Sequence, residues 1–277
     1  MRNLLSAGSV RLWRSKVFWL FCLFLAAATV SSVWTHYFDV TKYGAYFRID
    51  SVFRYYVLFI AFLIPIVCTL FIGTDYADGT VRNKVVCGHS KSSLYLSNLI
   101  LCSAASLIMC TAVVAPGLAM GLPLLGGFAM GTTRAILFFS GVYTLSLVWA
   151  ALFTFLAMLV SSRTVSVVAA MLLSLALLAA GAYLEGRLEA VPTIPTYTVT
   201  VNGEIVEGEG YPNPAYVPEG PVRDIFQFLR DFTPGGQTIQ HVNQQAEQPE
   251  VLIVYDAAVF VISTAAGLAL FRRRDLK

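Results

Sequence analysis

The feature that most constrains the fold is a series of six long apolar stretches. They are residues 17–34, 53–72, 93–115, 135–160, 164–184 and 251–271. A membrane-spanning helix needs about 20 mostly apolar residues, and inside lipid only helices and closed barrels satisfy their backbone hydrogen bonds. Only 13% of the residues are charged, against roughly 25% in soluble domains. We therefore predict an all-α polytopic membrane protein with six transmembrane helices.

The distribution of basic residues predicts the orientation. Six spans place both termini on one side, and that side carries twelve of the nineteen Lys and Arg residues but three of the sixteen Asp and Glu residues. Segments rich in Lys and Arg remain cytoplasmic. Both termini are therefore expected in the cytoplasm, with a small extracellular α+β region between the fifth and sixth spans.

Two segments beside the spans allow more than one interpretation. Residues 1–16 combine apolar and basic side chains, which suits an amphipathic helix on the inner leaflet or a basic flank that orients the first span. No charge occurs between Lys91 and Arg134, a stretch too long for one span. Its end, Pro116–Gly131, contains Pro and Gly and is expected to be a re-entrant turn or an apolar loop.

The outer loop, residues 185–250, is the one candidate for a soluble region. Residues 196–208 alternate around Asn202 and Gly203, a pair that strongly favours a β-hairpin turn. A helix is expected next, before Thr233, with its apolar face resting on the outer leaflet or on the membrane domain. The residues of that face are Ile225, Phe226, Leu229 and Phe232.

The sequence lacks several kinds of chemical site. It has no phosphate-binding loop motif, so we expect no ATP hydrolysis, no catalytic residues and no cofactor on this chain. Its histidines are too dispersed for a metal site, and a net charge of +3 does not indicate nucleic-acid binding. The ionisable residues nearest the spans are expected at span ends, where they can reach water. These residues are Arg54, Arg134, Arg163, Glu185 and Asp256.

The loop of residues 73–92 joins the second and third spans and concentrates acid, base and glycine. It predicts a short helix, Thr80–Cys87, that Asp78 or Thr80 would cap and that Gly88 would end in the left-handed conformation. The next helix would begin at Ser90 or Ser92. On physical grounds alone, this loop could press on a cytoplasmic protein or could simply fix the topology.

The same loop resembles the ABC-2-type transporter permeases, in which a Gly-x-Glu-Tyr-x-x-Gly-Thr-Ile-Arg-Asn-Lys sequence joins the second and third spans. Asp75 replaces the usual Glu, and Val81 replaces Ile. The C-terminal segment Phe271–Lys277 and the segment Pro234–Gln237 are also similar to that family. The matching loop residues are Gly73, Tyr76, Gly79, Thr80, Arg82, Asn83 and Lys84.

This resemblance implies the membrane subunit of a bacterial exporter, located in the cytoplasmic membrane. ATP and Mg²⁺ would be bound by two copies of a separate cytoplasmic ATPase, and a second permease chain, identical or homologous, would complete the transport path. Residues 1–16 would form a connecting helix. The residues implied to contact the ATPase are Asp75, Tyr76, Asp78, Gly79, Thr80, Val81, Arg82, Asn83 and Lys84.

The expected organisation is a connecting helix (1–16), five spans with the coupling loop (17–184), the outer region (185–250) and the last span with a basic tail (251–277). An uncharged membrane interior favours an amphipathic or hydrophobic cargo, either a peptide or a lipid-like molecule. The alternative is a non-transporting sensor, immunity or assembly protein that binds a ligand through its outer loop. An ion-driven carrier is disfavoured, because no ionisable residue is expected near the centre of a span.

Overall fold

The computed structural model describes residues 1–196, 198–201, 204–207, 210–244, 246 and 248–274. Six of its helices are long and apolar enough to cross a membrane, which supports the predicted polytopic, mainly helical fold. The helices are α1 (Arg2–Trp13), α2 (Lys16–Tyr43), α3 (Ile49–Phe53), α4 (Tyr56–Ala77), α5 (Thr80–Val86), α6 (Lys91–Leu125), α7 (Thr132–Leu159), α8 (Arg163–Leu188), α9 (Pro221–Phe232), α10 (Pro234–Asn243) and α11 (Pro249–Arg273).

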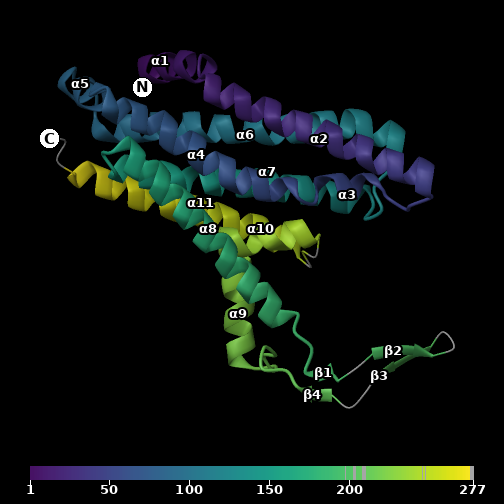
Figure 1. The fold of residues 1–277 in the computed structure, drawn as a ribbon. Coiled ribbons are helices and arrows are strands. Elements are labelled where there is room, and N and C mark those ends of the chain that lie inside the picture. The colour runs from purple at the N-terminus through teal and green to yellow at the C-terminus, as the bar shows by residue number, and fades with distance from the viewer. Residues whose placement is uncertain (197, 202–203, 208–209, 245, 247, 275–277) are drawn as a thin grey trace.

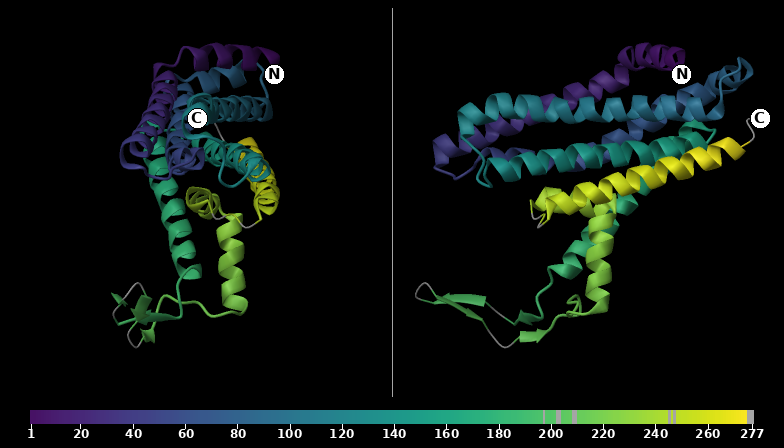
Figure 2. Two further views of the ribbon diagram at one scale, coloured as in Figure 1. Left: turned by 90° about the vertical axis from the view of Figure 1, so that its right-hand side faces the viewer. Right: turned by 180° about the vertical axis from the view of Figure 1, so that it is seen from behind.

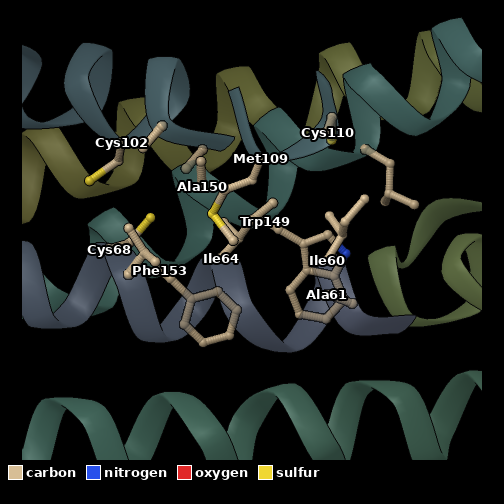
Figure 3. Packing of buried hydrophobic residues seen from close by; sticks show 14 of the residues in the cluster. Ile60, Ala61, Ile64, Cys68, Cys102, Met109, Cys110, Trp149, Ala150 and Phe153 are labelled. Atoms are coloured by element: carbon tan, nitrogen blue, oxygen red, sulfur yellow. The ribbon is translucent and has the colours of Figure 1, made fainter. Parts of the chain in front are cut away.

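The long helices form a bundle with α7 at its centre, packed against α4, α6 and α11. The inner face of α7 carries large and small side chains in alternation, so that Trp149 and Phe153 stack at 5.7 Å beside the fully buried Ala150 and Ala151. Ile64 of α4 and Met109 of α6 fill the spaces around them (Figure 3). Close packing of this kind fixes the relative positions of the spans.

Helix α1, helix α5 and the C-terminal end of α11 lie at the same end of the bundle, whereas α3 lies at the opposite end (Figures 1 and 2). We call these the terminal end and the loop end. Residues 1–16 contain the helix α1, which runs across the bundle at an angle to α2 (Figure 2), and its contact with the inner leaflet stays a prediction. Its buried Leu4 and Leu12 flank Gly8, which lies against Leu101 of α6. Part of its apolar side therefore faces protein.

The prediction for Pro116–Gly131 was wrong over most of its length. Residues 116–125 continue α6 as a helix, and its two prolines lie inside that helix. The reason is tertiary packing: a Cβ on Gly117 would lie 2.6 Å from the Phe53 ring, and one on Gly121 would lie 3.0 Å from Ile49. The short helix α3 fills the space that these glycines leave open, which stabilises an interrupted helix.

The outer region lies beyond α8, which leaves the bundle at an angle (Figure 1). Strands β2 (Thr198–Val201) and β3 (Glu204–Glu207) pair antiparallel, as predicted, and β1 (Thr193–Pro195) pairs with β4 (Gly210–Pro212). The turn residues Asn202 and Gly203 lie outside the described residues.

Helix α9 confirms the predicted helix before Thr233, but its apolar face is only partly covered. Phe232 packs against Tyr255 of α11 with ring centroids 5.8 Å apart. Ile225 and Leu229 are exposed, so this part of the face does not pack on the membrane domain, and its contact with the outer leaflet stays a prediction. Arg230 connects α9 to α8 through an ion pair with Glu185 at 3.5 Å.

Candidate functional site: the loop between α4 and α6

The loop between α4 and α6 contains the predicted short helix, with a correction at each of its ends. Helix α5 ends one residue earlier than expected, at Val86, and Gly88 follows in the left-handed conformation with φ 90°. The amide of His89 donates to the Lys84 carbonyl at 3.2 Å, and that of Gly88 donates to the Val85 carbonyl at 3.0 Å. These bonds satisfy carbonyls at the helix end.

The beginning of α5 differs from the prediction that Asp78 or Thr80 would cap it. The cap residue is Gly79, with φ 65°, and it makes no side-chain cap bond. The Thr80 hydroxyl instead donates to the carboxylate of Asp75 at 2.6 Å. Glycine is favoured here because side chains strongly disfavour positive φ. Ser90 caps the following helix α6, as predicted.

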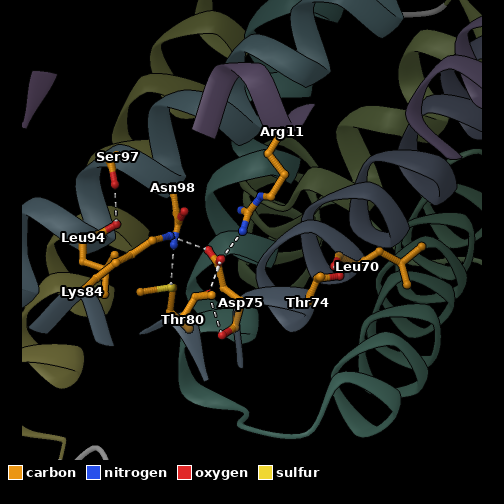
Figure 4. A network of polar contacts seen from close by, with 10 residues as sticks. Arg11, Leu70, Thr74, Asp75, Thr80, Lys84, Leu94, Ser97 and Asn98 are labelled. Carbon is orange, nitrogen blue, oxygen red and sulfur yellow. Dashed lines mark hydrogen bonds and ion pairs between the residues drawn. The ribbon is translucent and has the colours of Figure 1, made fainter. Parts of the chain in front are cut away.

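The carboxylate of Asp75 is the centre of this loop (Figure 4). Asp75 is only 1% exposed, and its two oxygens are shared among three partners. Oδ1 accepts hydrogen bonds from Arg11 of α1 and from Thr80, and Oδ2 pairs with Lys84 of α5 at 3.1 Å. A buried carboxylate needs such compensation, because burial removes the stabilisation that water gives its charge.

The Asp75 cluster therefore connects three elements that are separate in the sequence. Arg11 comes from α1, Asp75 from the end of α4, and Lys84 from α5. The Arg11 guanidinium also lies 3.9 Å from the ring centroid of Phe71, one turn before Asp75. A displacement of α5 must consequently move α4 and α1 with it or break charged hydrogen bonds.

Tyr76 forms a second connection at the terminal end. Its hydroxyl donates to the backbone carbonyl of Met158 in α7 at 2.7 Å. Arg274, just after α11, donates to the same carbonyl at 2.6 Å and to the Tyr76 hydroxyl at 3.2 Å. Together these bonds tie the ends of α4, α7 and α11, so Tyr76 acts within the bundle.

The nine residues expected to contact an ATPase therefore divide into two groups. Asp75 and Val81 are buried, and Tyr76, Thr80 and Lys84 are partly buried within the protein. Four face outward: Asp78, Gly79, Arg82 and Asn83. Val86, which was not among the predicted residues, is 78% exposed and adds an apolar side chain to this outer face.

The residues that sequence reasoning missed are the distant partners. Arg11 lies 64 positions from Asp75, and Arg274 lies 198 positions from Tyr76. The sequence analysis assigned neither arginine a partner. No spacing rule links positions so far apart, whereas the exposure of Val86 could have been read from its place opposite Val81 on a short helix.

At the loop end of the bundle, away from the Asp75 cluster, the buried polar side chains are mostly uncharged and belong to α10. Helix α10 packs on α8 through Gly235 and Gly236, and it buries Gln237, Thr238, Gln240 and His241. The ring of His241 donates from Nδ1 to the Gln237 carbonyl at 2.8 Å, and its Nε2 has no hydrogen-bond partner among the described residues. Burial lowers the pKa of His241, partly offset by this hydrogen bond.

The expectation that Asp256 and Glu185 reach water at span ends was wrong. Asp256 is 2% exposed and Glu185 is 3% exposed. The Asp256 carboxylate accepts a hydrogen bond from the Thr144 hydroxyl at 2.6 Å, and no cation pairs with it in the described part of the chain. A cavity of about 190 Å³ is lined by His241, Asp50 and Arg134.

Comparisons with known proteins do not assign this chain to a family. No family model matches the sequence, and no curated protein matches it.

Proposed function

We propose that this chain is the membrane-spanning permease of an exporter of the ABC-2 type, driven by a separate ATPase. The observation that supports this most directly is the arrangement of α5. Its outer face exposes Arg82, Asn83 and Val86, while its inner face is bonded into the bundle through Lys84 and Asp75. A protein bound to the exposed face of α5 could therefore displace it, and the Lys84–Asp75 ion pair would transmit the displacement to α4.

The proposed coupling follows from these bonds. ATP binding by the partner subunits would press on the outer face of α5. The displacement would reach α4 through Thr80 and Asp75, and would reach α1 and α2 through Arg11. The tilt of α2, α4 and α8 in each of two permease chains would then alter access to the path between them.

The cargo that we propose is an amphipathic or hydrophobic molecule, either a peptide or a lipid-like compound, moved outward across a bacterial cytoplasmic membrane. The core of the bundle is mainly apolar and aromatic, which favours such a cargo over sugars or inorganic ions. ATP and Mg²⁺ would be bound by the two ATPase subunits.

Co-purification tests the proposal. The full chain, extracted from its native membrane in mild detergent, is expected to recover a protein with a phosphate-binding loop, identified by peptide mass spectrometry. The double variant Arg82→Glu/Val86→Asp is expected to lower this recovery by about tenfold or more, because charge and apolar contacts at an interface centre contribute most to affinity.

The matched control is Lys42→Glu, which reverses a charge on an exposed residue at the loop end. It should recover the ATPase at the wild-type level. Equal recovery by wild type and the double variant, with normal membrane insertion of both, would contradict the role of α5. Failure of wild type to recover any such ATPase would contradict the exporter class itself.

The buried Asp256, Glu185 and His241 favour a second candidate, an ion-driven carrier, because ionisable residues inside membrane proteins often mark ion pathways. The two candidates predict opposite responses of export in cells. Collapse of the proton and sodium gradients at constant ATP should leave an ATP-driven exporter active and should stop an ion-driven carrier.

A further inference from the structure

A cavity of about 280 Å³ lies at the terminal end, where the turn between α1 and α2 meets α4 and the beginning of α8. It is separate from the outer face of α5. Three arginines line it: Arg11 and Arg14 from α1 and the following turn, and Arg163 from the first position of α8. They lie far apart in the sequence, so the fold brings these cations to one cavity.

The positive charge of this cavity is only partly compensated. Arg11 pairs with Asp75, and that carboxylate is shared with Lys84. Arg14 and Arg163 are exposed, and neither forms an ion pair within the described residues. Two guanidinium groups at the cavity are therefore available to an anion, and arginine geometry suits the oxygens of a phosphate group.

The lining of the cavity also includes apolar side chains. Val67, Leu70 and Phe71 of α4 contribute to it, together with Val17 and Phe18 of α2. Gly73, one turn beyond on α4, allows the α8 backbone to approach, because a Cβ at that position would lie 3.1 Å from the Cα of Arg163. A free phosphate ion would gain nothing from this apolar wall, whereas an acyl chain would.

Two tryptophans place the cavity at the depth of lipid headgroups. Trp13 directly precedes Arg14, and its ring lies 5.3 Å from that of Trp19, with both side chains exposed. The Trp19 indole donates to the Trp13 carbonyl at 2.8 Å, which fixes the pair at the turn between α1 and α2. Tryptophan is enriched at the boundary between headgroups and acyl chains.

We propose that this cavity binds an anionic phospholipid of the leaflet at the terminal end. Arg14 and Arg163 contact the lipid phosphate, and an acyl chain lies along Val67 and Leu70 of α4. Basic cavities between helices on the cytoplasmic side are suited to anionic headgroups. Because Arg11 lines the cavity and also binds Asp75, the lipid phosphate lies beside the charges that position α5. The bound lipid thereby stabilises the terminal end, and this binding does not depend on any transport activity.

The test measures lipid binding to the purified full chain. Wild type in detergent is titrated with phosphatidylglycerol, with phosphatidylcholine and with the soluble headgroup glycerophosphoglycerol, and bound lipid is counted by native mass spectrometry. Wild type is expected to retain phosphatidylglycerol in preference to phosphatidylcholine. The double variant Arg14→Gln/Arg163→Gln is expected to weaken the apparent affinity for phosphatidylglycerol by about tenfold or more, because each basic residue near a lipid surface contributes measurably to binding.

Two further double variants distinguish lipid binding in the cavity from attraction by the overall charge and from loss of binding through misfolding. Arg14→Lys/Arg163→Lys keeps the charge and should recover most of the binding. Arg272→Gln/Arg273→Gln removes the same charge from exposed residues of α11 that do not line the cavity, and it should bind as wild type does.

Three results would overturn the proposal. One is equal binding of phosphatidylglycerol by wild type and the Arg14→Gln/Arg163→Gln variant. Another is an equal loss in the α11 control, which would indicate attraction by overall charge. The third is equally tight binding of the soluble headgroup, which would assign the cavity to a soluble phosphate compound.

Discussion

Two buried carboxylates of the bundle, Asp75 and Asp256, are placed in opposite electrostatic surroundings. Asp75 and Asp256 are 1% and 2% exposed. Asp75 is surrounded by Arg11, Lys84 and Thr80, whereas Asp256 is bonded to the Thr144 hydroxyl and has no paired cation in the described residues. Two equally buried carboxylates therefore differ in whether nearby cations compensate a negative charge.

This difference in charge compensation indicates which structural role each carboxylate suits. A carboxylate with two cations and a hydroxyl is fixed in its charged form, and it connects three helices rigidly. Asp256 has no paired cation in the described residues, and its Oδ1 has no hydrogen-bond partner there, so it retains unused hydrogen-bonding capacity. The proposed coupling therefore assigns the transmission of a displacement to the Asp75 cluster and not to Asp256.

The largest expected effect comes from removing the charge of Asp75. The variant Asp75→Asn leaves Arg11 and Lys84 without a counter-charge and is expected to lower the free energy of unfolding by about 2 kcal/mol. This is below the usual cost of breaking a buried pair, because both cations are about a third exposed. Detergent-induced unfolding followed by circular dichroism measures it. The exposed Asp78→Asn is the control and should change stability by less than about 0.5 kcal/mol.

The next effect tests how tightly the loop end is packed. In Gly141→Ala, the added Cβ would lie 2.6 Å from Nε2 of the buried His241, so α7 and α10 must separate. We expect a loss of about 1.5 kcal/mol, within the usual range for overpacking. Gly186→Ala adds the same methyl group to α8 in open space and should be nearly neutral. Equal stability of Gly141→Ala and wild type would mean that α10 is loosely packed.

A third variant compares the two carboxylates directly. Asp256→Asn replaces a buried carboxyl group that has no paired cation among the described residues, and it retains an oxygen for the Thr144 hydroxyl. It is expected to leave stability unchanged or to raise it by about 1 kcal/mol, the opposite sign to Asp75→Asn, because an uncompensated charge is costly to bury. Both variants are measured in one unfolding series. A loss for Asp256→Asn comparable to that of Asp75→Asn would contradict the comparison.

The smallest expected effect is the pH dependence due to His241. Burial lowers its pKa below the ordinary value of 6.5, so the unfolded chain binds a proton more readily than the folded chain does. The contribution of His241 to stability is therefore complete above about pH 6.5 and is lost as the pH falls below it. Between pH 7 and pH 6 the loss is expected to stay below about 1 kcal/mol, since one proton gives a slope of at most about 1.4 kcal/mol per pH unit.

Thermal unfolding of wild type and of His241→Gln from pH 7.5 to pH 5.5 checks this expectation. The variant lacks the titrating ring and should show a flatter profile over this range. An identical pH profile for the two proteins would show that another group causes the dependence.

The local features of the loop between α4 and α6 could be predicted because they depend on neighbouring residues. Gly88 ends α5 in the left-handed conformation and Ser90 caps α6, as expected. The segment Pro116–Gly131 could not be predicted in the same way, because its helical continuation depends on Phe53 and Ile49 packing against two glycines. The same limitation applies to α10, whose close packing on α8 depends on Gly181 lying beside Gly235.

The sequence by itself determined the six membrane-spanning helices, the short helix between two of them and the β-hairpin of the outer region. These features follow from hydropathy and turn chemistry, which act over a few neighbouring residues. Only the tertiary structure decided which charges meet. Arg11 compensates Asp75 while Asp256 has no paired cation among the described residues, because helix packing brings distant positions together and no local pattern encodes that pairing.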